Sequence, residues 1–300
     1  MDNRQALGAT KGGNRLGRAV ANYWARQAQD IKSRAVARWH ALLCGIAALN
    51  IVVWSLSAIA VTHVHSMSPG GFSAWSQAQL LLSAAYVVGC AFRSVLPVYD
   101  IPRVVLVDSR LSSVLVGRSV ATIAELCFAA QWALLLHHMA VLSDSLPGRM
   151  LSQAIVPLIV LAELCSWYAV LTTAQRAHAL ENSLWAVSAM VVIACLLVME
   201  PHRVAGLSVP IITWCVGGAA YVAYIFLFDV PAYWSRWRAD QANGRHYLSI
   251  ASGLIDASQR RVVCYRWEVW KSEVPWMTLY FAFGVWTSVS LVYASLTLRP

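Results

Sequence analysis

The stretch ATIAELCFAAQW, residues 121–132, places Glu125 in the middle of an otherwise apolar run. A second apolar run, VPLIVLAELCSWYAVL at residues 156–171, repeats the letters AELC and places Glu163 near its middle. About 20 mostly apolar residues are enough for a helix to cross the hydrocarbon core of a bilayer. Both glutamates are therefore expected inside membrane-spanning helices, where an ionised carboxylate costs at least about 2.5 kcal/mol.

The composition of the whole chain agrees with a membrane protein. Of its 300 residues, 59% are hydrophobic and 12% are charged, whereas an average soluble domain has about 25% charged residues. The apolar stretches lack the alternation of a transmembrane barrel. The sequence therefore predicts an all-α polytopic membrane protein, a bundle of seven transmembrane helices. The predicted spans are residues 40–63, 76–96, 114–141, 151–173, 182–200, 207–229 and 275–297.

The distribution of Lys and Arg predicts how the bundle is oriented. With seven spans, the segments 1–39, 93–118, 174–181 and 231–274 share one side of the membrane, and they hold 20 of the 23 Lys and Arg residues. Cytoplasmic segments carry such an excess, so we expect the N-terminus inside and the C-terminus outside. This bias, with anionic lipids as partners at the inner surface, explains the net charge of +9 without a nucleic-acid partner.

Two regions outside the predicted spans are expected at the inner membrane surface. Residues 1–39 are predicted to form a basic tail and an amphipathic surface helix, because apolar residues from Leu16 to Ala35 recur at helical spacing. Residues 40–300 form the membrane domain, and their first stretch is interpreted as a true span rather than a cleaved signal peptide. The aromatic segment 231–274 is expected to cap the inner mouth of the bundle. The arginine-rich composition favours a bacterial plasma membrane.

The two glutamates belong to the first candidate site. A short loop joins their helices, so the helices are expected to be antiparallel neighbours whose carboxyl groups can meet near the midplane. Repulsion would then favour protonation of at least one carboxyl, giving a proton- or cation-binding site; the alternative is two neutral acids that hold helices together. Arg118 lies about 10 Å from Glu125 along the same helix face, with Thr122 between them. The predicted site comprises Glu125, Glu163, Arg118 and Gln131.

A second candidate site lies in the connection between the second and third spans, FRSVLPVYDIPRVVLVDSRLSSVLVGRS at residues 92–119. Pro97 and Pro102 interrupt any single helix there. Charges of both signs alternate within apolar sequence, which predicts a folded polar network at the inner leaflet. Such a network would bind a phosphate or anionic head group through its arginines, or it would be a structural salt-bridge cluster. The predicted network comprises Arg93, Asp100, Arg103, Asp108, Arg110, Glu181, Asn182 and Asp229.

Cysteines, histidines and short motifs give little further direction. Six of the seven cysteines fall inside predicted spans and no CxxC pair occurs, so they are interpreted as small apolar residues. The sequence contains no Walker motif, no GxSxG elbow and no histidine box of a membrane di-iron enzyme. The last span lacks the lysine that a retinal protein requires. No metal site is predicted and no cofactor is identified. The histidines at the outer ends of spans are His63, His65, His137 and His138.

Three functions fit these residues. The first, which we prefer, is a transporter or a proton- or cation-handling protein whose midplane site is formed by Glu125 and Glu163. The second is a membrane-embedded enzyme that acts on a lipid or isoprenoid at the inner leaflet, with arginines on the head group and an acidic residue as acid or base. The third is a non-catalytic scaffold or assembly subunit. The sequence leaves the ligand, a small ion or a lipid, and the oligomeric state open.

Overall fold

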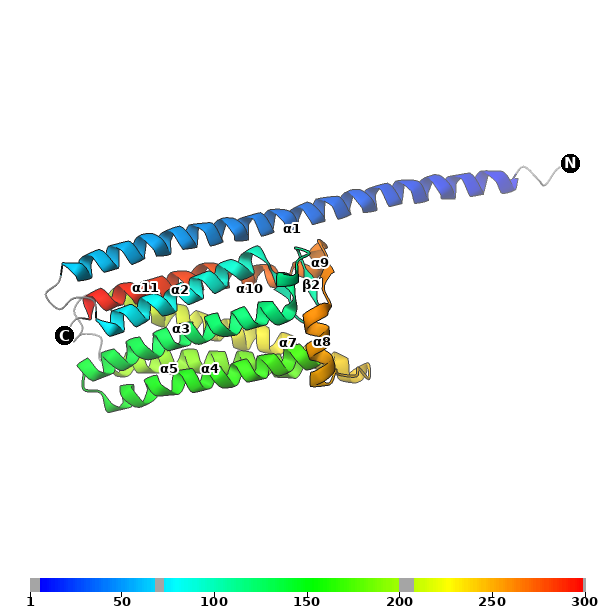
Figure 1. Ribbon diagram of the computed structural model, residues 1–300. Helices are drawn as coiled ribbons and strands as arrows, with labels where there is room; N and C mark the ends of the chain where they lie inside the picture. Colours follow the sequence, from blue (N-terminus) through cyan, green and yellow to red (C-terminus); the bar gives the residue numbers. More distant parts are fainter. Residues whose placement is uncertain (1–5, 68–72, 200–207, 299–300) are drawn as a thin grey trace.

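The computed structural model describes residues 6–67, 73–199 and 208–298, with side chains from residue 33 onward except those of residues 65, 208, 295 and 297. Within these ranges, seven helices are long and apolar enough to cross a membrane. They lie side by side in one bundle (Figure 1). The prediction of a helical bundle with seven candidate spans is therefore confirmed.

The first five long helices follow the predicted spans, with a difference at the N-terminus. The first helix begins at Ala6 and runs without a break into the first predicted span, projecting well beyond the bundle in Figure 1. Because side chains 1–32 lie outside the described residues, the amphipathic surface helix stays a prediction. The five helices are α1 (Ala6–Ser66), α2 (Ala74–Val95), α3 (Val114–Leu142), α4 (Leu146–Thr172) and α5 (Gln175–Val198).

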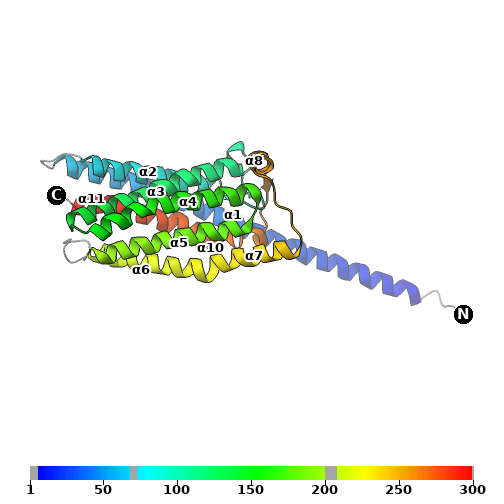
Figure 2. The same cartoon turned by 90° about the horizontal axis from the view of Figure 1, so that it is seen from below.

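Each of the last two spans contains a π-helical turn. The sixth span is α6 (Ser208–Tyr224), the π turn η3 (Ile225–Asp229) and α7 (Val230–Ala242), so this helix continues 13 residues beyond its predicted end at 229. The seventh span is α10 (Glu273–Leu279), the π turn η4 (Tyr280–Gly284) and α11 (Val285–Thr297). π turns inside α-helices are rare and are frequent at functional sites. Figure 2 shows α6 and α7 along one edge of the bundle.

One end of the bundle, here called the cap end, carries the short elements. A hairpin of β1 (Val98–Tyr99) and β2 (Val104–Val105) follows α2, where Pro97 and Pro102 were predicted to interrupt the helix. β2 also pairs in parallel with β3 (Val262–Val263), so the sheet order is β1-β2-β3. This small sheet was not predicted. The other elements here are η1 (Arg110–Ser112), α8 (Ile250–Gln259) and α9 (Trp267–Trp270).

Helix α8 lies across the cap-end termini of α3 and α4 (Figure 1). Its close approach depends on Gly253, because a Cβ atom at this position would lie 1.9 Å from the carbonyl oxygen of Leu171 in α4. A backbone hydrogen bond of 3.1 Å from Leu248 to Thr172 holds the preceding loop in place. The segment 231–274 was expected to be one interfacial cap. Its first part, to Ala242, instead extends the sixth span, and the cap is formed by the rest of the segment with α8 and α9.

The bundle has apolar side chains on its surface and polar side chains inside. Large apolar residues such as Leu81, Ile123 and Leu197 are more than 60% exposed on the outward faces of their helices. Conversely, Gln79 and Gln131 are completely buried between helices. A continuous apolar surface with polar groups inside is the arrangement expected of a helix bundle surrounded by lipid.

Candidate functional site

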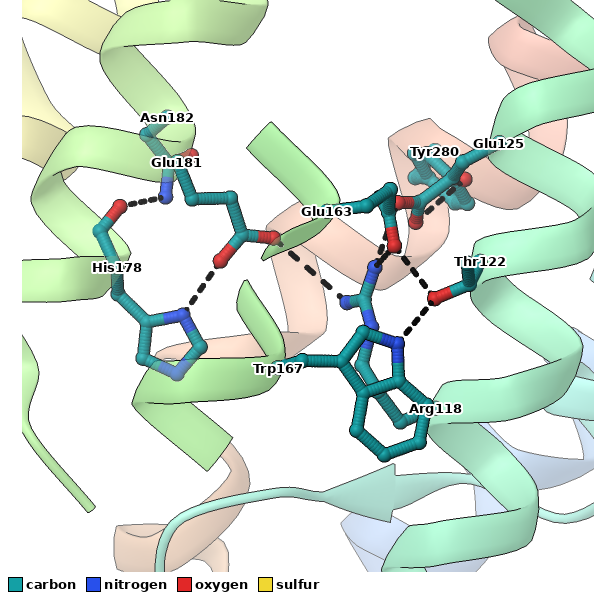
Figure 3. Close-up of polar contacts among 9 residues, drawn as sticks. All are labelled: Arg118, Thr122, Glu125, Glu163, Trp167, His178, Glu181, Asn182 and Tyr280. Atoms are coloured by element: carbon teal, nitrogen blue, oxygen red, sulfur yellow. Dashed lines mark hydrogen bonds and ion pairs between the residues drawn. The ribbon is translucent and has the colours of Figure 1, made fainter. Parts of the chain in front are cut away.

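Arg118 lies at the centre of the most highly charged part of the bundle interior. It is on the second turn of α3, near the cap end, and is 4% exposed. Its Nη2 atom lies 2.8 Å from Glu125 Oε2 and 2.6 Å from Glu163 Oε2. Both predicted carboxylates therefore contact a single guanidinium nitrogen, and the expected meeting of the two glutamates takes place through Arg118 (Figure 3).

Glu125 is held from two sides. Seven residues separate it from Arg118, which is close to two turns of α3, so both side chains project from the same face of the helix. On its other side, the hydroxyl of Tyr280 donates a hydrogen bond of 3.1 Å to Glu125 Oε1. Tyr280 is the first residue of the π turn η4, so the last span contributes directly to the site.

Glu163 is also connected to α3 by hydrogen bonds through Thr122. The hydroxyl of Thr122 donates to Glu163 Oε2 over 2.5 Å and accepts a hydrogen bond of 3.0 Å from Trp167 Nε1. Trp167 lies one turn from Glu163 on α4. The other carboxyl oxygen, Glu163 Oε1, is buried and has no hydrogen-bond partner among the described residues.

A third carboxylate, which was not assigned to this site from the sequence, comes from α5. Glu181 Oε1 lies 3.6 Å from Arg118 Nη1, and its Oε2 lies 2.6 Å from Nδ1 of His178. Asn182 donates a hydrogen bond of 2.9 Å to the carbonyl of His178. His178 is on the first turn of α5, so this pair extends the site toward the cap end (Figure 3).

The charges of this cluster do not balance. Three carboxylates face one guanidinium in the described contacts, so two negative charges remain if His178 is neutral and one remains if it is charged. Uncompensated charge is costly in a buried environment, because little water is present to solvate it. The cluster therefore requires at least one additional proton or cation to become neutral.

Gln131 does not lie in the carboxylate cluster with which it was predicted. It belongs to a separate polar cluster, nearer the end of the bundle that is remote from the cap end. Gln79 donates to the carbonyl of Gln131 over 2.9 Å, Ser288 donates to Gln131 Oε1 over 2.5 Å, and Ser83 lies 2.9 Å from Ser288. All four side chains are completely buried.

The second predicted network forms several smaller contacts. Arg103 binds Asp256 through Nε at 2.8 Å, and it donates to the carbonyls of Asp100 and Val170 at 2.9 and 2.8 Å. Asp108, on the exposed surface, pairs with Arg261 at 3.0 Å. The structure thus joins two of the predicted residues to partners on the 231–274 segment.

The remaining predicted network residues lie apart from one another. Arg110 is exposed in η1, and Arg93 is half-buried in the last turn of α2. Asp229 is half-buried in the π turn η3. No contact in the described part of the chain joins Arg93, Arg103 and Arg110 around a common point, which is the arrangement that an anionic head group would need.

Tyr280 and His178 were not predicted as site residues. Tyr280 belongs to a span that is far from Glu125 in the sequence, and a tyrosine in an aromatic helix gives no local signal. Glu181 and His178 are three residues apart, a spacing at which helix side chains face each other. That spacing was the signal in the sequence that could have identified His178 as a partner of Glu181. Within the described residues, no group of three or more His, Cys, Asp or Glu side chains is arranged to hold a metal ion.

The chain matches no protein-family model, no curated protein and no solved structure, so its site is interpreted from its own geometry.

Proposed function

We propose that this chain is a multi-pass membrane protein that moves protons across the membrane, alone or together with a solute. The carboxylates of Glu125, Glu163 and Glu181 around Arg118 would be the proton-binding site. The observation that carries the proposal is the charge imbalance of this buried cluster, in which three carboxylates contact one guanidinium.

A proton fits the cluster better than a metal cation does. Ions such as Ca²⁺ require six to eight oxygen ligands. Five of the six carboxylate oxygens in the cluster already contact Arg118, Tyr280 or His178. In the described structure, Glu163 Oε1 is the one that has no partner. A single oxygen is enough to bind a proton, and we assign the proton to the Glu163 carboxyl.

Protonation would also change the positions of the side chains. A neutral Glu163 attracts the guanidinium less strongly, because protonation removes the Coulomb attraction between two opposite full charges. Arg118 would then favour Glu125 and Glu181, on the two sides of Glu163. The occupancy of the site would thus be coupled to the packing of α3 against α4 and α5, which is the coupling that a transporter needs.

The proposed orientation follows from the positive charges. The cap end carries the segments that hold most of the Lys and Arg residues, so it would face the cytoplasm, with the C-terminus outside. The arginine-rich composition supports a bacterial plasma membrane. In this orientation His178 and Glu181 connect the site to the inner side.

The experiment uses the purified full chain in liposomes. Infrared titration of the wild type is expected to show the carbonyl band of a protonated carboxylic acid that grows as the pH is lowered. Glu163→Gln should remove this band, whereas Asp144→Asn should retain it, because the side chain of Asp144 is 95% exposed. Absence of a pH-dependent band in the wild type would contradict the proposal.

Transport is measured in the same liposomes with a trapped pH indicator and an imposed potassium diffusion potential. The wild type is expected to acidify the lumen faster than empty liposomes, and Glu163→Gln should reduce the rate to that of empty liposomes. Wild-type proton flux in both Glu125→Gln and Glu163→Gln would show that the carboxylates do not carry the proton.

A further inference from the structure

A buried polar face follows α2 from the end remote from the cap toward the carboxylate cluster. Ser76, Gln79, Ser83 and Tyr86 are spaced three or four residues apart, so they lie on one side of the helix. Each is no more than 1% exposed. Polar residues are costly inside a membrane bundle, and a continuous line of them connects regions that an apolar face would separate.

The first part of this face is a closed hydrogen-bonded chain. It consists of Gln79, Gln131, Ser288 and Ser83, which link α2, α3 and α11. The last part is the hydrogen bond from Tyr280 to Glu125 Oε1. Between these two parts lies Tyr86.

The hydroxyl of Tyr86 is buried and makes no hydrogen bond of standard geometry among the described residues, but it interacts with the side chains of Tyr280 and Cys90. Its ring packs edge to face with that of Tyr280, with 6.1 Å between the ring centroids. Tyr86 lies one turn from Ser83 on α2, and Gly284 lies one turn from Ser288 on the last helix. A Cβ atom on Gly284 would lie 2.5 Å from the Tyr86 hydroxyl. The two helices thus place this hydroxyl about one helical turn from the Ser83–Ser288 pair, on the side toward the carboxylate cluster.

We infer that the hydroxyls of Tyr86 and Tyr280 relay protons between the Gln131–Ser288 chain and Glu125, and that Gly284 leaves the space this relay needs. The inference rests on the proposed function and names the route by which its site reaches the outer side. A buried hydroxyl without a hydrogen bond of standard geometry, in line between two hydrogen-bonded groups, is the expected form of such a link.

The transfer conserves both atoms and charge. Tyr280 gives its hydroxyl proton to Glu125 Oε1 and receives one from the Tyr86 hydroxyl. Tyr86 receives a proton from a water molecule that bridges to Ser83 or Ser288, over a distance of about one helical turn. That water takes a proton from the serine hydroxyl, and the serine is reprotonated by a hydronium ion that arrives from the outer aqueous phase and leaves as water. Each O–H bond that breaks is replaced by a new one, so both tyrosines end neutral and the carboxylate ends protonated.

Groups on several helices set the charge around Glu125, and the relay must deliver a proton in their presence. They are Arg118 on α3, Glu163 on α4, Glu181 on α5, Tyr221 on α6, Tyr280 on η4, and Tyr86, Cys90 and Arg93 on α2.

The test separates the binding of protons from their delivery. Tyr86→Phe keeps the ring and removes the hydroxyl, so the infrared carboxylic band should titrate as in the wild type while proton flux falls. We expect a fall of about a hundredfold, the lower end of what one positioned proton-transfer group contributes. The matched control is Tyr293→Phe, which removes a hydroxyl from an exposed position on α11 and should leave both measurements unchanged.

Gly284→Ala provides a second variant that keeps every polar group. Its methyl group would occupy the position of the Tyr86 hydroxyl, so flux should fall while the band persists. Wild-type flux in Tyr86→Phe would overturn the relay and leave the proposed proton site intact. Loss of the band in a folded Tyr86→Phe protein would also overturn it, because the hydroxyl would then belong to the binding site. If Tyr86→Phe does not fold, wild-type flux in Gly284→Ala overturns the relay.

Discussion

Two buried arginines in this molecule have opposite surroundings. Arg103, at the cap end, is 1% exposed and faces one carboxylate and two backbone carbonyls, and all three of its side-chain nitrogens donate hydrogen bonds. Arg118, in the bundle, is 4% exposed and faces three carboxylates, and its Nε has no partner in the described structure. The two side chains are buried to a similar degree but differ in charge balance.

This difference distinguishes a structural contact from a candidate site. The Arg103 contacts join the β1–β2 hairpin to α4 and α8. Asp256 also lies 3.7 Å from the exposed Arg260, so no negative charge is left over. Its backbone has a φ of 56°, a conformation that non-glycine residues rarely adopt, so the contacts also have to offset strain of about 1 kcal/mol. In the Arg118 cluster three carboxylates face one guanidinium, and Arg118 Nε and Glu163 Oε1 have no hydrogen-bond partner among the described residues. Such an arrangement is a poor way to stabilise a fold, and it is well suited to bind a proton.

The largest expected effect comes from removing the central guanidinium. Arg118→Met would leave three carboxylates without their cation, so we expect the free energy of unfolding to fall by about 3–5 kcal/mol. The measurement is reversible unfolding in mixed micelles, followed by tryptophan fluorescence. The double variant Arg118→Met/Glu163→Gln should recover part of this loss, because it removes one of the opposing charges. An equal loss in both variants would contradict the charge argument.

Removing the other buried arginine should have a smaller effect. Arg103→Met loses three hydrogen bonds, but the side chain of Asp256 is 21% exposed and water can solvate its carboxylate. We expect a loss of about 2–3 kcal/mol, with proton flux per folded molecule unchanged. Arg261→Met, which removes the partner of the exposed Asp108, is the matched control and should change stability by less than about 1 kcal/mol. A flux defect in Arg103→Met would mean that the cap end takes part in transport.

The smallest changes in stability are expected from neutralising one carboxylate beside each buried arginine, and they compare the two arginines most directly. Asp256→Asn and Glu163→Gln each neutralise one carboxylate that contacts a buried arginine. Asp256→Asn removes the carboxylate that faces Arg103 and Arg260, so it should cost about 1–2 kcal/mol of unfolding free energy. Glu163→Gln reduces an excess of negative charge and should change stability by less than about 1 kcal/mol in either direction. If Glu163→Gln destabilised the protein more than Asp256→Asn does, the carboxylate cluster would be structural.

Most members of the Arg118 cluster could be identified in the sequence, because the cost of burying charge is a local property. Glu125 and Glu163 were identified by their apolar surroundings, and Arg118 and Thr122 by their spacing along one helix face. These are the residues whose side chains meet in the structure. The regular spans followed from length and hydropathy, although α1 and α7 extend further than hydropathy indicated.

The rest depends on contacts between distant parts of the chain. Tyr280 reaches Glu125 across 155 positions in the sequence, and Arg103 reaches Asp256 across 153. The pairing of β2 with β3 is likewise long-range and involves two residues in each strand, too few for a periodic pattern. Gln131 was grouped with Glu125 and both lie on α3. Both also contact the last span, but Gln131 does so through Ser288 and binds α2, whereas Glu125 does so through Tyr280 and meets α4 through Arg118.

The π turn at Tyr280–Gly284 rotates the second half of the last span relative to its first half. One additional residue in a turn rotates everything beyond it by about 100°. Tyr280 and Ser288 are eight positions apart, which is about 80° around an unbroken α-helix. The extra residue brings them toward one side of the span, where Tyr280 contacts Glu125 and Ser288 contacts Gln131. Deleting one residue from this turn would leave the composition of the span almost unchanged. It would nevertheless separate the Ser288 end of the buried polar face from the Tyr280 end. In this span, the helical register determines which side chains meet, as much as the identity of the side chains does.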